Sequence, residues 1–196
     1  MNDIYKPCIC NSGKKFKFCC YGKISGSKSK AIPAQLSISY PLHLCLATKN
    51  WQDEGLAQTM LVRIMPNGRY IFAMYLIDVW FLGVKDCDIR VDISLAEVTA
   101  IKDIMAMSQT LVPISYEDLR SLVFGSIHYA YDQGFAPHDD WEHAKYMLEP
   151  ERSFDNKFKF GRNGKPCYIQ GPYDEANGVF GHRRIKHPQK LEMQNG

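Results

Sequence analysis

The stretch Thr59-Met-Leu-Val-Arg-Ile-Met-Pro-Asn-Gly-Arg-Tyr-Ile-Phe-Ala-Met-Tyr-Leu-Ile-Asp-Val-Trp-Phe81 decides the fold of this chain. Two apolar runs, 59–65 and 70–81, flank the dipeptide Asn67-Gly68, and both of these turn residues accept positive φ angles. The pattern predicts an antiparallel hairpin. Because polar and apolar residues alternate imperfectly in the second run, we expect that strand to be buried on both faces or bent.

Outward from this hairpin, further short strands are expected at 42–47 and 87–91, with Gly83-Val-Lys-Asp86 as an interruption between strands. A hairpin about Asn163-Gly164 is expected near the C-terminal end of the domain. Strands on both sides of a helical block predict an α+β domain of antiparallel hairpins and about three helices, over residues 37–177.

The helical block has clear start signals. Ser94 is a good N-cap for a helix from Leu95 to about Met107, and Ser115 for one from Tyr116 to about Gln133. Apolar residues recur at helical spacing in both segments. A third helix is expected to start at residue 139 or 140 and to stop before Pro150.

Composition bounds the class of protein. The chain has 196 residues, of which 45% are hydrophobic and 12% aromatic, which is typical of a folded domain. No apolar run is long enough to span a bilayer, and the first residues lack the apolar core of a secretory signal, so we expect a cytoplasmic protein. Charge is divided unevenly: residues 1–30 carry seven lysines and one acid, 31–150 are acidic, and 151–196 are basic again.

Four of the seven cysteines lie close together, at Cys8, Cys10, Cys19 and Cys20. The segment around them is rich in lysine and poor in apolar residues, so burial alone cannot fold it. Two cysteine pairs on either side of a turn can close on one ion, and four thiolates in a tetrahedral array suit structural zinc. The spacing therefore predicts one structural zinc ion, whose binding would fold the segment.

The run Cys8-Ile-Cys-Asn-Ser-Gly-Lys-Lys-Phe-Lys-Phe-Cys-Cys-Tyr-Gly22 resembles the SEC-C motif, a short zinc-binding module. It departs from the family pattern at Ile9, where the family has proline, at Asn11, where it has glycine, and at Tyr21, which delays the final glycine. None of these changes affects a ligand. The resemblance covers residues 8–22 only, and the rest of the chain is not assigned to a family.

The resemblance implies docking rather than catalysis. We expect residues 1–22 to form the module, 23–36 a flexible Ser- and Lys-rich linker, and 178–196 a loose basic tail. Lys14, Lys15 and Lys17 around Phe16 can pair with phosphates and offer a stacking surface. The expected function is therefore that of a zinc-binding adaptor, whose module contacts the ribosome, RNA or a protein partner on behalf of the α+β domain.

The alternative is an enzyme, of hydrolase type, that the module delivers to its substrate. Its acid/base site would draw on Asp78, Lys85, Asp86, His128 and His138. Each has a simpler interpretation: Asp78 as a strand-edge acid, Lys85 and Asp86 as a solvated pair in a turn, and His128 as a histidine satisfied by Asp132.

The segment His138-Asp-Asp-Trp-Glu-His143 holds five residues that could bind a metal ion. On a helix, however, its two histidines lie on divergent faces, and the spacing of a zinc-protease helix is absent. Asp139 and Asp140 are explained as N-cap and first-turn acids. The segment by itself does not predict a metal site, and no phosphate-loop, dinucleotide-binding or serine-hydrolase motif is present in the chain.

Overall fold

The computed structural model describes residues 39–149 and 157–169. The predicted zinc module at 1–22, with its four cysteine ligands and its basic binding residues, lies outside these residues. So do the linker at 23–36 and the tail at 178–196.

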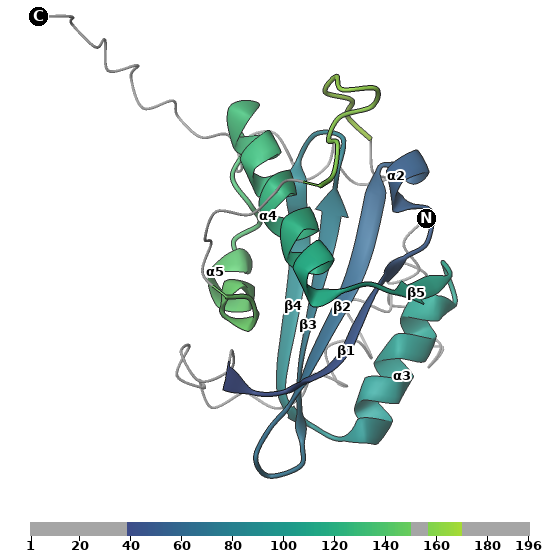
Figure 1. Ribbon diagram of the computed structural model, residues 1–196, viewed down its shortest axis with the longest axis vertical. Coiled ribbons are helices and arrows are strands. Elements are labelled where there is room, and N and C mark those ends of the chain that lie inside the picture. Colours follow the sequence, from purple (N-terminus) through teal and green to yellow (C-terminus); the bar gives the residue numbers. More distant parts are fainter. Residues whose placement is uncertain (1–38, 150–156, 170–196) are drawn as a thin grey trace, which may run out of the picture.

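The described residues form an α+β fold around a five-stranded antiparallel sheet (Figure 1). The strand order is β4-β3-β2-β1-β5, so β4 and β5 are the edge strands. The strands are β1 (Leu42–Thr48), β2 (Leu56–Ile64), β3 (Tyr70–Asp78), β4 (Gly83–Ile93) and β5 (Leu111–Pro113).

The predicted hairpin is confirmed as β2 and β3, which pair from Leu56 with Asp78 to Ile64 with Tyr70. Gly68 has the expected positive φ of 76°, but Asn67 does not share it. Instead, the Asn67 side-chain oxygen accepts a hydrogen bond from the backbone N–H of Arg69 at 3.0 Å. An asparagine side chain can replace a backbone group in a turn in this way.

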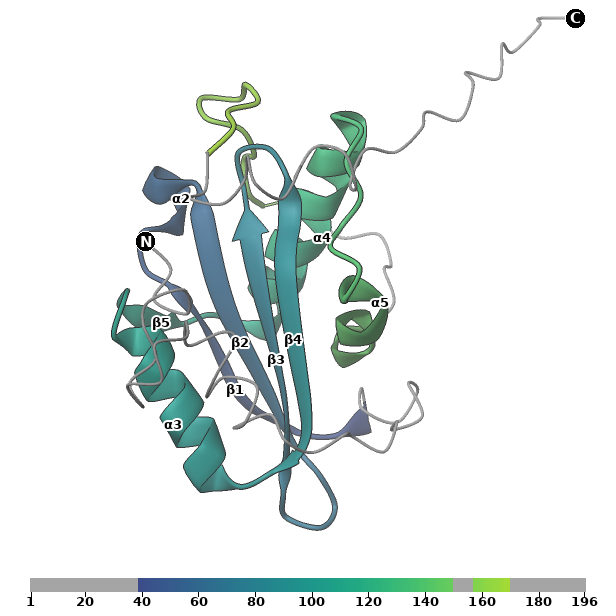
Figure 2. The ribbon, with the colours of Figure 1, turned by 180° about the vertical axis from the view of Figure 1, so that it is seen from behind.

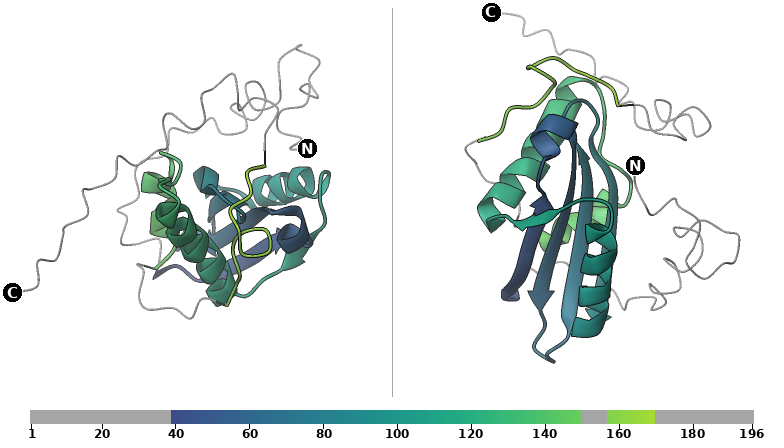
Figure 3. Two further views of the ribbon diagram at one scale, coloured as in Figure 1. Left: turned by 90° about the horizontal axis from the view of Figure 1, so that it is seen from above. Right: turned by 90° about the vertical axis from the view of Figure 1, so that its right-hand side faces the viewer.

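Strand β3 is buried on both faces, as its imperfect alternation predicts. Side chains alternate across a sheet, so Ile71, Ala73 and Tyr75 enter one core and Phe72 and Met74 the other. Helix α4 (Tyr116–Asp132) and the short α5 (Trp141–Ala144) cover the first face, and α3 (Leu95–Ala106) covers part of the second (Figures 2 and 3). The sheet is thus the middle layer of three.

Both long helices begin where their caps predict. The Ser94 side chain accepts from the N–H of Glu97, whose carboxylate accepts from the N–H of Ser94, which completes a capping box for α3. The Ser115 side chain accepts from the N–H of Asp118 at the start of α4. No helix within the described ranges has the length and apolar character needed to cross a bilayer.

Four expectations need correction. The interruption at 83–86 is wrong, because β4 begins at Gly83 and continues without a break. Strand β3 ends at Asp78, three residues before the expected end. The third helix is only α5 followed by the 3-10 turn η4 (Lys145–Met147), and the C-terminal hairpin is reduced to one bridge, Arg162 with Lys165.

Two short elements were not predicted. Helix α2 (Trp51–Glu54) follows β1 directly, and β5 is held by its pairing with β1.

Candidate functional site

Edge strand β4 carries a β-bulge close to its start. Ile77 of β3 pairs with Val84, and the next residue back, Leu76, pairs with Asp86, so Lys85 is the extra residue on β4. A bulge changes the direction of the side chains that follow it and is common beside functional sites. Here Asp86 is the first residue after the bulge, on a strand whose outer edge faces the connection between α4 and α5.

That connection is fixed to β4 by its backbone. The N–H of His138 donates to the carbonyl oxygen of Val84 at 3.0 Å, and the N–H of Trp141 donates to the carbonyl oxygen of His138 at 2.9 Å. His138 is therefore held between the edge of the sheet and the first turn of α5. The two contacts place its side chain next to Asp86.

Asp140 occupies the N-cap position of α5, but its side chain makes no capping hydrogen bond. The predicted helix start at residue 139 or 140 is confirmed, but the Asp140 side chain does not cap the helix. Its carboxylate instead lies beside the imidazole of His138, with Oδ2 3.4 Å from Nδ1. The backbone N–H of Asp140 also points at Nδ1, at 3.2 Å.

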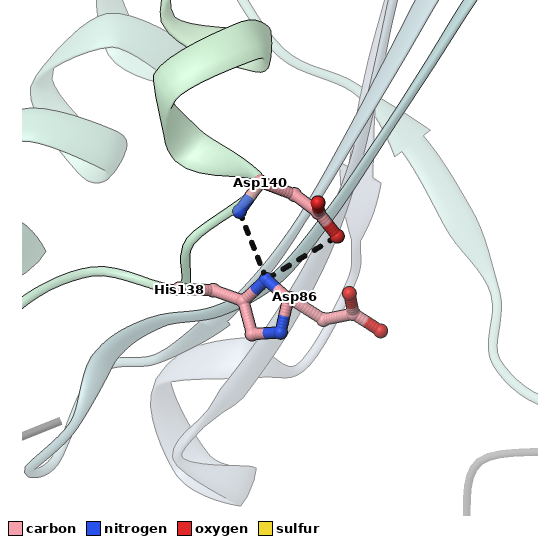
Figure 4. A group of neighbouring side chains, drawn as sticks. All are labelled: Asp86, His138 and Asp140. Carbon is pink, nitrogen blue, oxygen red and sulfur yellow. Dashed lines mark hydrogen bonds and ion pairs between the residues drawn. The ribbon is translucent and has the colours of Figure 1, made fainter. Parts of the chain in front are cut away.

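Asp86, His138 and Asp140 together form a compact group of ligand-capable side chains (Figure 4). One ligand atom from each lies within 4.8 Å of the others. The group opens to solvent, because Asp86 is half-buried and the side chains of His138 and Asp140 are 37% and 59% exposed. Two carboxylates around an imidazole can orient a general base or hold a metal ion.

Asp78 has a different environment at the end of β3. It is fully buried, and its Oδ1 accepts from the backbone N–H groups of Trp80 and Phe81 at 3.0 and 2.9 Å. Burial raises the pKa of this carboxyl group above its ordinary value, against the opposing effects of the Lys85 charge and the backbone N–H donors. The carboxyl group shapes the β3–β4 turn.

Two buried polar atoms near this turn have no hydrogen-bond partner among the described residues. They are Oδ2 of Asp78 and the hydroxyl of Tyr129 on α4. Burial, followed by the Asp78 charge, raises the pKa of Tyr129. A Cβ on Gly161, whose φ is 82°, would lie 2.6 Å from the Tyr129 hydroxyl and 2.9 Å from the backbone N and O of Lys165, so this position favours glycine.

The five candidates for an acid/base site therefore separate. The structure brings Asp86 and His138 together, and Lys85 lies near enough to Asp78 to lower the pKa of that carboxyl group. Asp78 does not belong to the Asp86 group, nor does His128, which lies exposed on α4. Sequence reasoning missed Asp140 as a member, because its position before a helix already explained it.

Comparison of the chain with protein-family models, with curated proteins and with solved structures finds no match.

Proposed function

We propose that this chain is a zinc-dependent docking protein. Cys8, Cys10, Cys19 and Cys20 would hold one structural zinc ion, and the module so formed would contact a partner on behalf of the α+β domain. The observation that carries the proposal is the spacing of the four cysteines within a lysine-rich segment too poor in apolar residues to fold by itself.

The described part of the chain, 39–149 and 157–169, forms a domain with a large apolar cluster on each face of its sheet. We propose that the zinc-binding segment, folded around its own ion, serves as the contact module of this domain.

Charge favours an anionic partner for the module. Residues 1–30 are strongly basic, whereas 31–150 carry fifteen acids and eight basic residues. A polyanion such as ribosomal RNA would be attracted to the first segment and repelled by the second. Lys14, Lys15 and Lys17 would pair with phosphates, and Phe16 would offer a stacking surface. A protein partner is the other outcome that the test below can reveal.

The test measures zinc and binding in the same proteins. Full-length chain and a Cys10→Ser/Cys19→Ser variant are analysed for zinc content and are sedimented with ribosomes over a salt series. Cys167→Ser, which removes a half-buried cysteine outside the cluster, is the matched control. We expect one zinc ion on the cysteine cluster and salt-sensitive co-sedimentation in the wild type and the control, and loss of both in the double variant.

The failures separate the two parts of the proposal. One zinc ion that is retained in the double variant, and is still retained when His138→Gln is added to it, contradicts the assignment of the cysteine ligands. If zinc is lost but no protein sediments with ribosomes at any salt concentration, zinc binding stands and RNA is the wrong partner. A Lys14→Gln/Lys15→Gln variant should keep its zinc and show a shallower dependence of binding on salt, because fewer counterions are released.

The enzyme alternative keeps one specific observation in its favour, the convergence of Asp86, His138 and Asp140. In this reading His138 is the general base and the Asp140 carboxylate orients its imidazole. Hydrolysis of p-nitrophenyl acetate and p-nitrophenyl phosphate by the full chain should then fall in His138→Gln and not in His143→Gln. Equal rates in the three proteins would rule out His138 as the base for these substrates.

A further inference from the structure

The Asp86 group lies far from the cysteine cluster in sequence and has a different set of donor atoms. We propose that Asp86, His138 and Asp140 form a site for a divalent first-row transition-metal ion, with water completing the coordination. The proposal is independent of the docking function, because none of the three residues belongs to the zinc module.

The atoms of His138 and Asp140 already have the spacing of two ligands on one ion. Nitrogen and oxygen ligands bind such an ion at about 2.0 to 2.2 Å. Two ligands in a tetrahedral arrangement are then about 3.4 Å apart, and two on opposite sides of the ion about 4.2 Å. Nδ1 and Oδ2 are 3.4 Å apart. One ligand atom of Asp86 lies within 4.8 Å of a His138 nitrogen and of an Asp140 oxygen, so a movement of the Asp86 side chain toward them would complete the set.

The partners of Nδ1 make opposite demands on it. The backbone N–H of Asp140 needs a lone pair on this nitrogen, whereas the Asp140 carboxylate next to it needs a positive charge or a donated proton. A cation bound to the Nδ1 lone pair and to Oδ2 would satisfy both of these side-chain atoms, and it would displace the Asp140 N–H, which would then donate to water. The second carboxylate, from Asp86, would balance the remaining charge of a divalent ion.

The chain around the site fixes two of the three ligands before an ion arrives. The His138 backbone is hydrogen-bonded to Val84, and α5, which follows Asp140, is tied to the sheet by the Tyr75 hydroxyl, which donates to the carbonyl oxygen of Ala144 at 2.9 Å. The partial exposure of His138 and Asp140 leaves room for water ligands. An ion held in this way would connect edge strand β4 to the α4–α5 connection.

The donor set indicates which ions fit. One imidazole and two carboxylates suit Mn²⁺, Fe²⁺, Co²⁺ or Zn²⁺. Cys87 follows Asp86 directly, but it is buried in the core on the α4 side of the sheet. The site is therefore of mixed nitrogen and oxygen character, and Mn²⁺ is a suitable probe because the thiolate cluster is a poor competitor for it.

The experiment titrates Mn²⁺ into full-length protein that has been dialysed against EDTA and then against buffer. The electron paramagnetic resonance signal of free Mn²⁺ reports how much is bound. Asp86→Asn, His138→Gln and Asp140→Asn each remove one ligand. Asp139→Asn and His143→Gln are matched controls, because both residues are exposed neighbours outside the group.

We expect one Mn²⁺ per chain, at least tenfold weaker binding in each ligand variant, and a change of less than twofold in the controls. Loss of a partner that merely orients a ligand already costs about 10- to 100-fold in affinity, so loss of a ligand should cost no less. Cys10→Ser/Cys19→Ser, made in the full chain, should bind Mn²⁺ as the wild type does, whatever becomes of the docking function.

Three results would overturn the site. The first is a wild type that does not deplete the free signal up to millimolar Mn²⁺. The second is a control variant that weakens binding as much as the ligand variants do. The third is loss of the ion in the Cys10→Ser/Cys19→Ser variant. Far-UV circular dichroism checks that each variant is folded. If Asp86→Asn on β4 does not fold, His138→Gln and Asp140→Asn decide the question.

Discussion

Gly83 is the point where β4 begins and where the backbone of α4 lies close to the sheet. It has a φ of 64°, and a Cβ at this position would lie 2.7 Å from the Ser126 carbonyl oxygen and 2.8 Å from the Ala130 Cβ. A helix backbone cannot rotate away as a flexible side chain can. Gly83→Ala should therefore cost about 1–2 kcal/mol for the left-handed conformation and about 1–3 kcal/mol for overpacking.

Gly68 is the matched control for this substitution. Its φ is 76°, and nothing lies within 4 Å of the position that a Cβ would take. Gly68→Ala should therefore cost only the conformational part, about 1–2 kcal/mol. The difference between the two variants, about 1–3 kcal/mol, measures how tightly α4 packs against the start of β4.

Urea unfolding of full-length wild type and both variants, followed by far-UV circular dichroism, measures this difference. We expect the Gly83→Ala midpoint to lie clearly below that of Gly68→Ala, with similar slopes. Equal midpoints would refute the close contact between Gly83 and α4. Because β4 carries Asp86 and α4 leads to His138, we also expect Gly83→Ala to weaken Mn²⁺ binding, with Gly68→Ala unchanged.

Three further substitutions test the fold and the turn beside the site. Asp78 has a raised pKa in the folded state, so the stability linked to its protonated form is lost as pH rises above about 4. The unfolding free energy of Asp78→Asn should therefore increase relative to that of the wild type between pH 4 and pH 7. Urea titrations in which the difference between the two proteins is the same at both pH values would contradict this. Ser94→Ala removes the capping box of α3 and should lower the unfolding free energy by about 1 kcal/mol in the same assay. Tyr75→Phe leaves the Ala144 carbonyl oxygen without its donor, so it should lower the unfolding free energy by about 1–2 kcal/mol and weaken Mn²⁺ binding. Unchanged stability would mean that this hydrogen bond does not hold α5 against the sheet.

The parts of the fold that the sequence predicts are those set by local chemistry. Ser94 and Ser115 mark helix starts because their side chains bond to N–H groups only three residues ahead. The β2–β3 hairpin follows in the same way from Asn67-Gly68 between two apolar runs. In each case the deciding contact joins residues that are close together in the chain.

The start of β4 fails as a prediction for the opposite reason. Glycine followed closely by lysine and aspartate is typical of a turn, and that is how residues 83–86 are interpreted from sequence. The sheet accepts them because Gly83 adopts a positive φ and Lys85 is absorbed as a bulge. Both adjustments depend on pairing with β3. Strand β5 is similar: only its pairing with β1 makes Leu111–Pro113 a strand.

The candidate site shows how far local interpretation can mislead. Asp140 stands where an N-cap acid belongs, and that explanation removes it from consideration as a ligand. The hydrogen bond from His138 to Val84 changes the outcome, because it brings the helix start against the edge of β4, beside Asp86. An acid at a helix start that makes no capping hydrogen bond keeps its carboxylate available for another role. In this chain that carboxylate lies beside Nδ1 of His138. The Mn²⁺ titrations of the ligand variants, and not the preference of acids for helix starts, therefore test the role of Asp140.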